Sequence, residues 1–152
     1  MKWNDVSLWP LTSVNRFMPD VFTKAKRSEV MSRIRGRGNK DTELALAKLL
    51  RTHRITGWRR NQPLFGKPDF VFLKARLAVF VDGCFWHGCP THATKPKNNR
   101  VFWQRKLFAN KRRDELVTRT LRNAGWRVIR IWECALAKRP AGCLKRIEQA
   151  LS

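Results

Sequence analysis

The run from Val81 to His92 constrains this chain more than any other segment. Its twelve residues hold two of the four Cys and two of the three His. It follows a hydrophobic stretch, Leu77 to Val81, which we interpret as a buried strand. A strand that leads into a loop rich in Cys and His predicts a metal-pinned loop at the mouth of an active site.

The charge of the chain indicates which partner such a site would serve. There are 33 Lys and Arg against 11 Asp and Glu, a net charge of +22, spread over nearly the whole 152-residue sequence. A field of this size favours polyphosphate partners through counterion release, so nucleic acid is the expected ligand. The alternatives are a merely soluble basic protein and a binder of anionic membrane surfaces. The second is disfavoured because no segment combines a long apolar face with a basic face.

Length and composition predict one domain. We expect an N-terminal arm at residues 1–20 and a single domain at residues 21–152. The arm contains Asp5 and lacks the continuous apolar core of a signal peptide, and no stretch approaches the roughly 20 apolar residues needed to span a bilayer. We therefore expect a cytoplasmic protein whose Cys residues stay reduced and serve a metal or catalysis more than disulfides.

The order of the expected elements predicts an α/β fold, a mixed sheet with helices packed on it. The strands are expected at 58–61, 69–73, 77–81 and 126–132, and the helices at 23–35, from a cap at Asp41 or Thr42 onward, at 99–123 and at 141–151. The long helix at 99–123 carries Asn110 and Asp114 on the stripe that should face the core.

Acidic residues are scarce, so their positions are informative. Asp69 stands at the start of one expected strand and Asp82 at the end of the next, so strand pairing would bring the two carboxylates together beside the Cys/His-rich loop. Carboxylates near nucleic acid repel phosphate unless a cation lies between them, and Mg²⁺ prefers such oxygen ligands. The metal would polarise a phosphodiester and activate a water.

Three further residues are candidates for this site. Glu43 and Asp114, on helices that face the sheet, would position water or metal ligands, and His87 would donate a proton to the leaving oxygen. Ordinary alternatives exist for each: a first-turn helix charge for Glu43, an ion pair with Arg for Asp114, and a zinc ligand or structural histidine for His87. For Asp69 the alternative is a turn at the start of a strand.

The Cys and His spacing predicts a structural zinc site. Cys84, Cys89 and His92 offer three ligands within nine residues, and Cys134 would supply the fourth from the end of the last strand. Four such ligands with no open position are typical of a structural site. Cys143 would replace His92, or is simply a buried helical thiol.

Two aromatic residues lie inside the same loop. Phe85 and Trp86 are out of helical or strand register with the core, and rigid apolar side chains on a pinned basic loop can wedge between base pairs. They would otherwise pack under the loop as a small satellite core. Trp103, on the stripe of the long helix, is a core residue by default.

Motifs in order along residues 20–137 are characteristic of one family. They are Asp20-Val-Phe-Thr, Arg27-Ser-x-x-Met-Ser-Arg-Ile, Gly66-Lys-Pro-Asp-Phe, Val81-Asp-Gly-Cys-Phe-Trp-His-Gly-Cys-Pro, Phe102-Trp103, Asn110-x-x-Arg113-Asp114 and Gly125-Trp-Arg-Val to Trp132-Glu-Cys-Ala-Leu. Together they resemble the very short patch repair endonucleases. The resemblance implies a restriction-endonuclease-like fold with a structural zinc. It also implies an enzyme that nicks one DNA strand 5′ to the thymine of a T:G mismatch left by deamination of 5-methylcytosine.

The resemblance also implies residue roles. Asp69 matches the central Mg²⁺ ligand, assisted by the backbone carbonyl of Val81. The other active-site residues match Glu43, His87 and Asp114, with His87 near the scissile phosphate. The family's aromatic wedge from the major-groove side matches Phe85, Trp86 and Trp103, the residue inserted from the opposite groove matches Met31, and two zinc ligands match Cys84 and Cys134.

The chain departs from the family pattern at two places. Asp82 stands where some members have a second catalytic His, so the proton-transfer scheme would differ, or Asp82 would bind metal instead. The zinc loop is shorter, with Cys89 where a His ligand would fall. This leaves His92 as the replacement for the remaining Cys.

The combined hypothesis is a monomeric, Mg²⁺-dependent, strand-specific endonuclease that starts T:G mismatch repair on double-stranded DNA and leaves a nick for repair-pathway proteins. One alternative is a nuclease of the same fold with restriction or structure specificity, because base preference depends on loop geometry and flanking contacts. Another is a zinc-stabilised DNA-binding module without catalysis, although a pure binder gains nothing from carboxylates near phosphate.

Overall fold

A four-stranded mixed sheet is the centre of the computed structural model, which describes residues 42–92 and 99–152. The strands β1 (Trp58–Arg59), β2 (Phe70–Phe72), β3 (Leu77–Asp82) and β4 (Arg127–Trp132) follow one another across the sheet in chain order. The first three are antiparallel neighbours, whereas β3 and β4 run parallel. A parallel pair needs a long crossover connection, and the helix α3 (Arg100–Asn123) lies within it.

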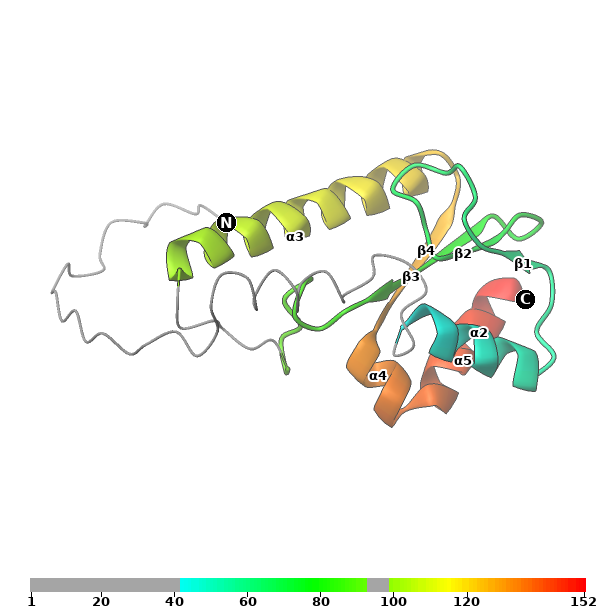
Figure 1. Ribbon diagram of the computed structural model, residues 1–152. Coiled ribbons are helices and arrows are strands. Elements are labelled where there is room, and N and C mark those ends of the chain that lie inside the picture. The colour runs from blue at the N-terminus through cyan, green and yellow to red at the C-terminus, as the bar shows by residue number, and fades with distance from the viewer. Residues whose placement is uncertain (1–41, 93–98) are drawn as a thin grey trace, which may run out of the picture. The chain divides into compact units, whose positions relative to one another are not determined.

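Helices cover both faces of the sheet (Figure 1). On one face, α3 buries Val117 and Leu121 against Phe80. The helices α2 (Glu43–Thr52), α4 (Glu133–Lys138) and α5 (Pro140–Leu151) pack on the other face, over the larger apolar core. Successive strand residues point to opposite faces, so β3, covered on both sides, is buried along its whole length. This is the restriction-endonuclease-like arrangement that the sequence predicts.

The expected elements within the described residues are confirmed, with ends that differ by at most two positions. One helix was missed: α4 starts directly after β4 and spans only six residues, too few to show a helical period. The helix expected at 23–35 and the arm at 1–20 lie outside the described residues. No helix in the described ranges is long and apolar enough to cross a membrane.

The two polar residues on the inner stripe of α3 have partners in other segments. The Asn110 side-chain amide donates a hydrogen bond to the Trp86 carbonyl at 2.8 Å, and Asp114 contacts His87. Further along the same stripe, Val117 and Leu121 are buried in the core. One half of α3 therefore anchors the helix on the sheet, and the other half contacts the Cys/His-rich loop.

The turn before Asp69 is held close to α3. Gly66 has a φ of +77°, a conformation that L side chains rarely adopt, and a Cβ at this position would lie 2.2 Å from Val117 Cγ1. A glycine is therefore required for the turn to approach the helix. The close approach sets where the chain enters β2, and with it the position of Asp69.

Candidate active site and metal centre

Asp69 precedes β2, and its carboxylate is fixed against β3. Its Oδ2 accepts a hydrogen bond from the backbone N–H of Val81 at 2.7 Å. Burial, together with the carboxylates of Glu43 and Asp82, raises the pKa of Asp69 to about 6, although the hydrogen bond from the Val81 N–H acts in the opposite direction. Several carboxylates that share a partly buried space form an arrangement that a bound cation would stabilise.

Glu43, the first residue of α2, brings a second carboxylate to Asp69. Its side chain is buried and forms an ion pair with Arg60, which follows β1. Both carboxylates, together with the carbonyl of Val81, are hard oxygen donors of the kind that Mg²⁺ prefers. The residues present therefore fit a divalent cation at this end of β2 and β3.

A second group of charged residues surrounds His87. The Nδ1 atom of His87 lies 2.5 Å from Asp114 Oδ2 and 3.8 Å from Asp82 Oδ1. Arg130, on β4, donates two hydrogen bonds to Asp82, from Nε to Oδ2 at 2.7 Å and from Nη2 to Oδ1 at 2.8 Å. The same Nη2 lies 3.0 Å from Asp114 Oδ1. We call these four residues the His87 cluster.

The charges within the His87 cluster compensate for its partial burial. Burial alone would raise the pKa of Asp114, but the hydrogen bond from His87 and the charge of Arg130 hold this pKa below its ordinary value. Asp114 is therefore an anion that fixes the orientation of the imidazole ring. A cavity of about 260 Å³ opens beside the ring, and it is lined by Asp82, His87, Gly88, Pro90, Lys111, Asp114, Glu115, Arg130 and Trp132.

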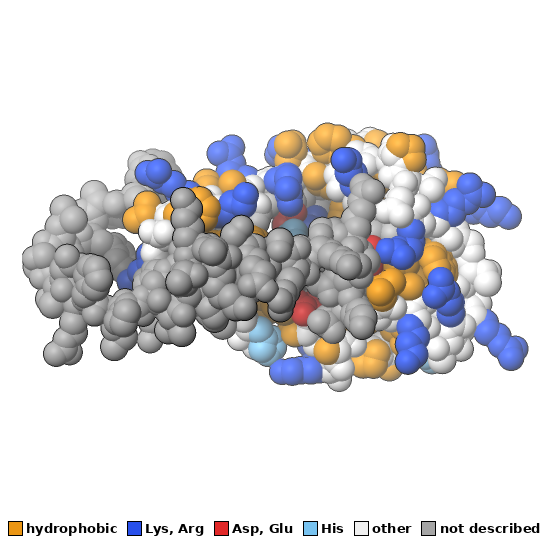
Figure 2. Space-filling view, viewed as in Figure 1, with side chains coloured by type: hydrophobic (Ala, Val, Ile, Leu, Met, Phe, Trp, Pro, Cys, Tyr) orange, Lys and Arg blue, Asp and Glu red, His pale blue; other side chains and the backbone are white. Residues whose placement is uncertain are grey.

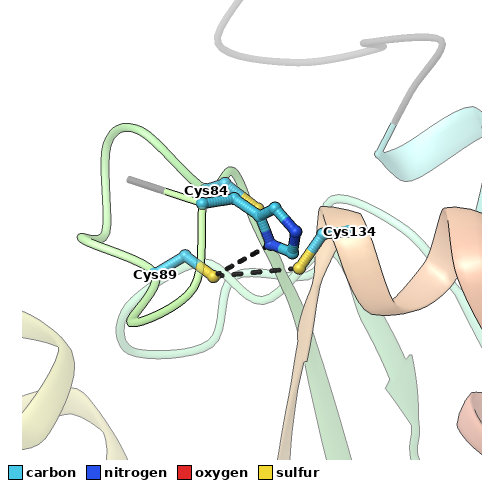
Figure 3. A group of neighbouring side chains, drawn as sticks. Cys84, Cys89 and Cys134 are labelled. Atoms are coloured by element: carbon cyan, nitrogen blue, oxygen red, sulfur yellow. Dashed lines mark hydrogen bonds between the residues drawn. The ribbon is translucent and has the colours of Figure 1, made fainter. Parts of the chain in front are cut away.

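Three cysteines and one histidine form a candidate metal centre at the neighbouring loop. The ligand atoms of Cys84, Cys89, His92 and Cys134 all lie within 4.8 Å of one another. Figure 3 shows the side chains of Cys89 and Cys134 turned toward each other, with their sulfur atoms 3.8 Å apart. Tetrahedral zinc with Zn–S bonds of about 2.3 Å would place two sulfurs at about this separation.

The structure favours His92 over Cys143 as the fourth member of this group. His92 Nδ1 lies 3.9 Å from the sulfur of Cys89. Cys143, in contrast, is buried within α5 among the residues of the larger apolar core. The loop is also tied to α4, because the backbone N–H of Cys84 donates to Glu133 Oε2 at 3.2 Å.

Four aromatic side chains gather beside the loop, and we call them the aromatic patch. They are Phe85, Trp86, Phe102 and Trp103. Phe85 contacts both Trp86 and Trp103, with ring centroids 5.1 and 5.2 Å apart, and Phe102 packs on Trp103 at 5.4 Å. The patch is not sealed, since Phe102 remains 58% exposed. The default expectation of a core position for Trp103 is wrong, because its ring lies in this patch and is only partly buried.

The surface around these groups is strongly basic. Figure 2 shows Lys and Arg side chains spread over the described part of one face, with acidic side chains visible at only a few points. Most of the acids near β2 and β3 belong to the two groups described above. The charge pattern therefore combines a basic surface with a local concentration of carboxylates, as expected for a metal-assisted site that acts on phosphate.

The structure brings together the predicted site residues that it describes. Asp69 and Glu43 form one group and His87, Asp82 and Asp114 a second, and Met31 lies outside the described residues. Three basic neighbours of these groups, Arg130, Arg60 and Lys111, are not among the residues predicted from the sequence. The position of Arg130 could have been predicted from the alternation of β4. Arg130 shares a face of the strand with Val128, which packs against the apolar residues between α3 and the sheet.

Comparison with known proteins assigns the family. A family profile described as "DNA mismatch endonuclease Vsr" matches residues 19–93. The type II nicking enzyme V.NmeDIP of Neisseria meningitidis serogroup C is 40% identical over 134 residues, which cover 87% of this chain and 90% of that protein. The type II nicking enzyme V.NaeI of Lentzea aerocolonigenes is 54% identical over 67 residues, 44% of this chain and 40% of its own length.

A mismatch endonuclease is also among the relatives. The DNA mismatch endonuclease Vsr of Escherichia coli (strain K12) is 38% identical over 125 residues, which cover 80% of this chain and 78% of that protein. This extent of identity over most of both chains exceeds what a shared fold alone requires. The chain belongs to the Vsr family of DNA mismatch endonucleases and is a hydrolytic DNA endonuclease.

Proposed function

We propose that this enzyme nicks one strand of duplex DNA 5′ to the thymine of a T:G mismatch and so starts very short patch repair. The observation that carries the proposal is the continuity of Phe85, Trp86 and His87, which places the aromatic patch directly beside the His87 cluster. The aromatic patch, which is suited to probe the base stack, thus adjoins the His87 cluster, which is suited to act on phosphate. The names of the relatives support both mismatch and nicking activity.

The carboxylates of Asp69 and Glu43, with the Val81 carbonyl, would hold Mg²⁺, which supplies positive charge to the phosphate oxygens when bound. His87 donates Nδ1–H to Asp114, so Nε2 is the nitrogen that faces the substrate, and the imidazolium form of the ring would donate its second proton from Nε2. As the oxygen of a water forms its bond to phosphorus, the bond to the 3′ oxygen breaks. The proton from His87 leaves with that oxygen as the 3′ hydroxyl. One proton of the water remains on the new 5′ phosphate, and the other passes to solvent, from which His87 is protonated again.

We assign a structural zinc to Cys84, Cys89, His92 and Cys134. Four protein ligands leave no open position for a substrate or water, so the ion would anchor the loop and take no part in the reaction. The anchored loop presents Phe85 and Trp86. We expect a monomer at the nucleoid in the cytoplasm, with repair-pathway proteins acting after the nick.

The test is nicking of three labelled duplexes, one with a T:G mismatch and the matched T:A and C:G duplexes, and of their single strands. We expect cleavage of the thymine strand of the T:G duplex alone, and only when Mg²⁺ is present. Equal cleavage of mismatched and matched duplexes would indicate a nicking enzyme with another specificity. Absence of cleavage with full DNA binding would instead support a zinc-stabilised binding module.

The aromatic patch provides a separate prediction about mismatch recognition. Changing Trp103→Ala removes the ring that contacts both Phe85 and Phe102, so we expect a roughly tenfold to hundredfold weaker affinity for the T:G duplex. Affinity for a matched duplex should change less than threefold, because phosphate contacts dominate there. Fluorescence anisotropy with both duplexes measures the two affinities.

The matched control for this prediction is Phe108→Ala. Phe108 lies on the same helix and is 63% exposed, and the guanidinium of Arg112 lies 5.9 Å from the centre of its ring. We expect this variant to keep the preference of the parent protein for the mismatch. An equal loss of affinity in both variants, or on both duplexes, would contradict a wedge role for the patch.

A further inference from the structure

Arg130 occupies an unusual place for an arginine, between the sheet and α3. It pairs with Phe80 in the register of β3 and β4, and its guanidinium lies 4.7 Å from the centre of the Phe80 ring. Asp82 lies two residues beyond Phe80 and therefore shares its face of the sheet. The Arg130 side chain is only 23% exposed. Placing a charge there costs free energy unless groups of opposite charge pair with it and accept its hydrogen bonds.

The guanidinium joins two carboxylates that belong to different elements. It binds Asp82, the last residue of β3, in the bidentate geometry typical of strong Arg–carboxylate pairs, and the same Nη2 reaches Asp114 on α3. The remaining nitrogen, Nη1, is buried and has no hydrogen-bond partner among the residues described. All three nitrogens are therefore either engaged or sealed, which leaves no free donor for a DNA phosphate.

The chain of contacts ends at His87. Asp114 uses one oxygen for Arg130 and the other for His87 Nδ1, so the position of the imidazole depends on a carboxylate that Arg130 holds. Asp82 has both oxygens bound to the guanidinium, which makes it a poor ligand for a second cation. Without Arg130, the buried carboxylate of Asp82 and the partly buried carboxylate of Asp114 would lose the guanidinium that both of them contact.

We propose that Arg130 is a positioning residue for His87, and that Asp82 anchors Arg130 and does not bind the catalytic metal. The relay runs from Asp82 through Arg130 and Asp114 to His87, and it sets which nitrogen of His87 faces the DNA. The inference rests on the proposed function for its kinetic effect. Its structural part, the orientation of one imidazole, is independent of activity.

The structural part is tested on the zinc-loaded protein without DNA or Mg²⁺. Long-range ¹H–¹⁵N spectra at pH 8 distinguish the two imidazole tautomers, and the chain has only three His, so a His87→Ala spectrum assigns the signal. We expect His87 to be protonated at Nδ1 in the parent protein and to show a mixture of tautomers in Arg130→Gln. An unchanged tautomer in Arg130→Gln would overturn the relay.

The kinetic part is tested by single-turnover nicking of the T:G duplex. We expect Arg130→Gln to lower the rate constant about 100-fold, with DNA affinity within threefold, because misplacement of a catalytic group by about 1 Å has an effect of this size. In a His87→Ala background, Arg130→Gln should lower the rate less than twofold, because the imidazole that Arg130 positions is already absent. A full 100-fold loss in that background would show that Arg130 acts on folding or on DNA and not through His87.

Two further variants keep the test decisive. If Arg130→Gln does not fold, as judged by thermal unfolding, Arg130→Lys takes its place. A point charge cannot hold both carboxylates in the same geometry, so we expect about a tenfold loss that disappears in the His87→Ala background. Asp82→Asn should leave the Mg²⁺ concentration for half-maximal rate within twofold, whereas a tenfold increase would identify Asp82 as a metal ligand.

The outcomes separate the inference from the proposed function. A parent protein that nicks no T:G duplex contradicts the proposed function, and the tautomer measurement still decides the relay. A parent protein that nicks the mismatch, combined with additive effects of Arg130 and His87 substitutions, contradicts the relay alone.

Discussion

Asp69→Ala is expected to lower the rate of nicking at least about 1,000-fold while DNA binding is preserved. The carboxylate at the start of β2, beside the end of β3, is the proposed main ligand for a divalent cation, and the charge stabilisation that such a cation provides amounts to several kcal/mol. Binding should be unchanged or slightly tighter, because the variant removes a negative charge near the DNA backbone. Single-turnover rates and anisotropy on the same duplex measure both quantities.

The matched control is Glu148→Ala, which removes an exposed carboxylate on α5, on the opposite side of the sheet from α3. This variant has the same change of net charge as Asp69→Ala and should nick at the parental rate. Retention of activity in Asp69→Ala would remove Asp69 from the mechanism. A comparable loss of DNA affinity and rate would instead indicate that the substitution disturbs the fold around Val81.

The second large effect is expected for Cys134→Ser. The parent protein should retain one zinc per chain through dialysis, and the variant should retain none, because a closed four-ligand site loses most of its affinity with one thiolate. We expect a loss of unfolding free energy of about 4 kcal/mol or more, and a melting temperature lower by about 10 °C or more. Elemental analysis and thermal unfolding monitored by circular dichroism provide the two measurements.

Cys143→Ala is the control for the zinc prediction, because Cys143 is a buried cysteine outside the ligand group. It should retain the zinc, with a loss of stability of about 1 kcal/mol from the smaller side chain. A metal-free parent protein that is fully folded would contradict the structural zinc. Loss of the metal in Cys143→Ala and not in Cys134→Ser would assign the ligands differently.

The parts of the fold that the sequence predicts correctly are those set by local patterns. The stripe on α3 and the alternation of β4 follow from the periods of helix and strand, which are visible in a single segment. The six-residue α4 has no such period and was missed. Three members of the candidate metal centre, Cys84, Cys89 and His92, are close in sequence, so their grouping is predictable from spacing. Cys134 is also predicted, from its place at the end of the last strand, although it joins the other three only through the tertiary fold.

The pairing of charged side chains within the site depends on the tertiary structure, so the sequence predicts it only in part. A carboxylate such as Asp82 is equally suited to a metal ion and to a guanidinium, and sequence spacing does not distinguish these partners. The choice becomes visible only when the parallel register places Arg130 beside Phe80 and close to Asp82. For the same reason, the ion pair between Glu43 and Arg60, 17 positions apart, had no sequence signal.

The parallel pairing of β3 and β4 has a consequence for how the molecule folds. Cys89 and Cys134 stand 45 positions apart, and their sulfur atoms meet only after α3 has formed and the chain has returned to the sheet. Such non-local contacts raise the contact order and form late, since loop-closure entropy must be lost first. Zinc uptake would therefore report the completion of folding, and a nascent chain would acquire its nuclease geometry only after the whole sheet is assembled.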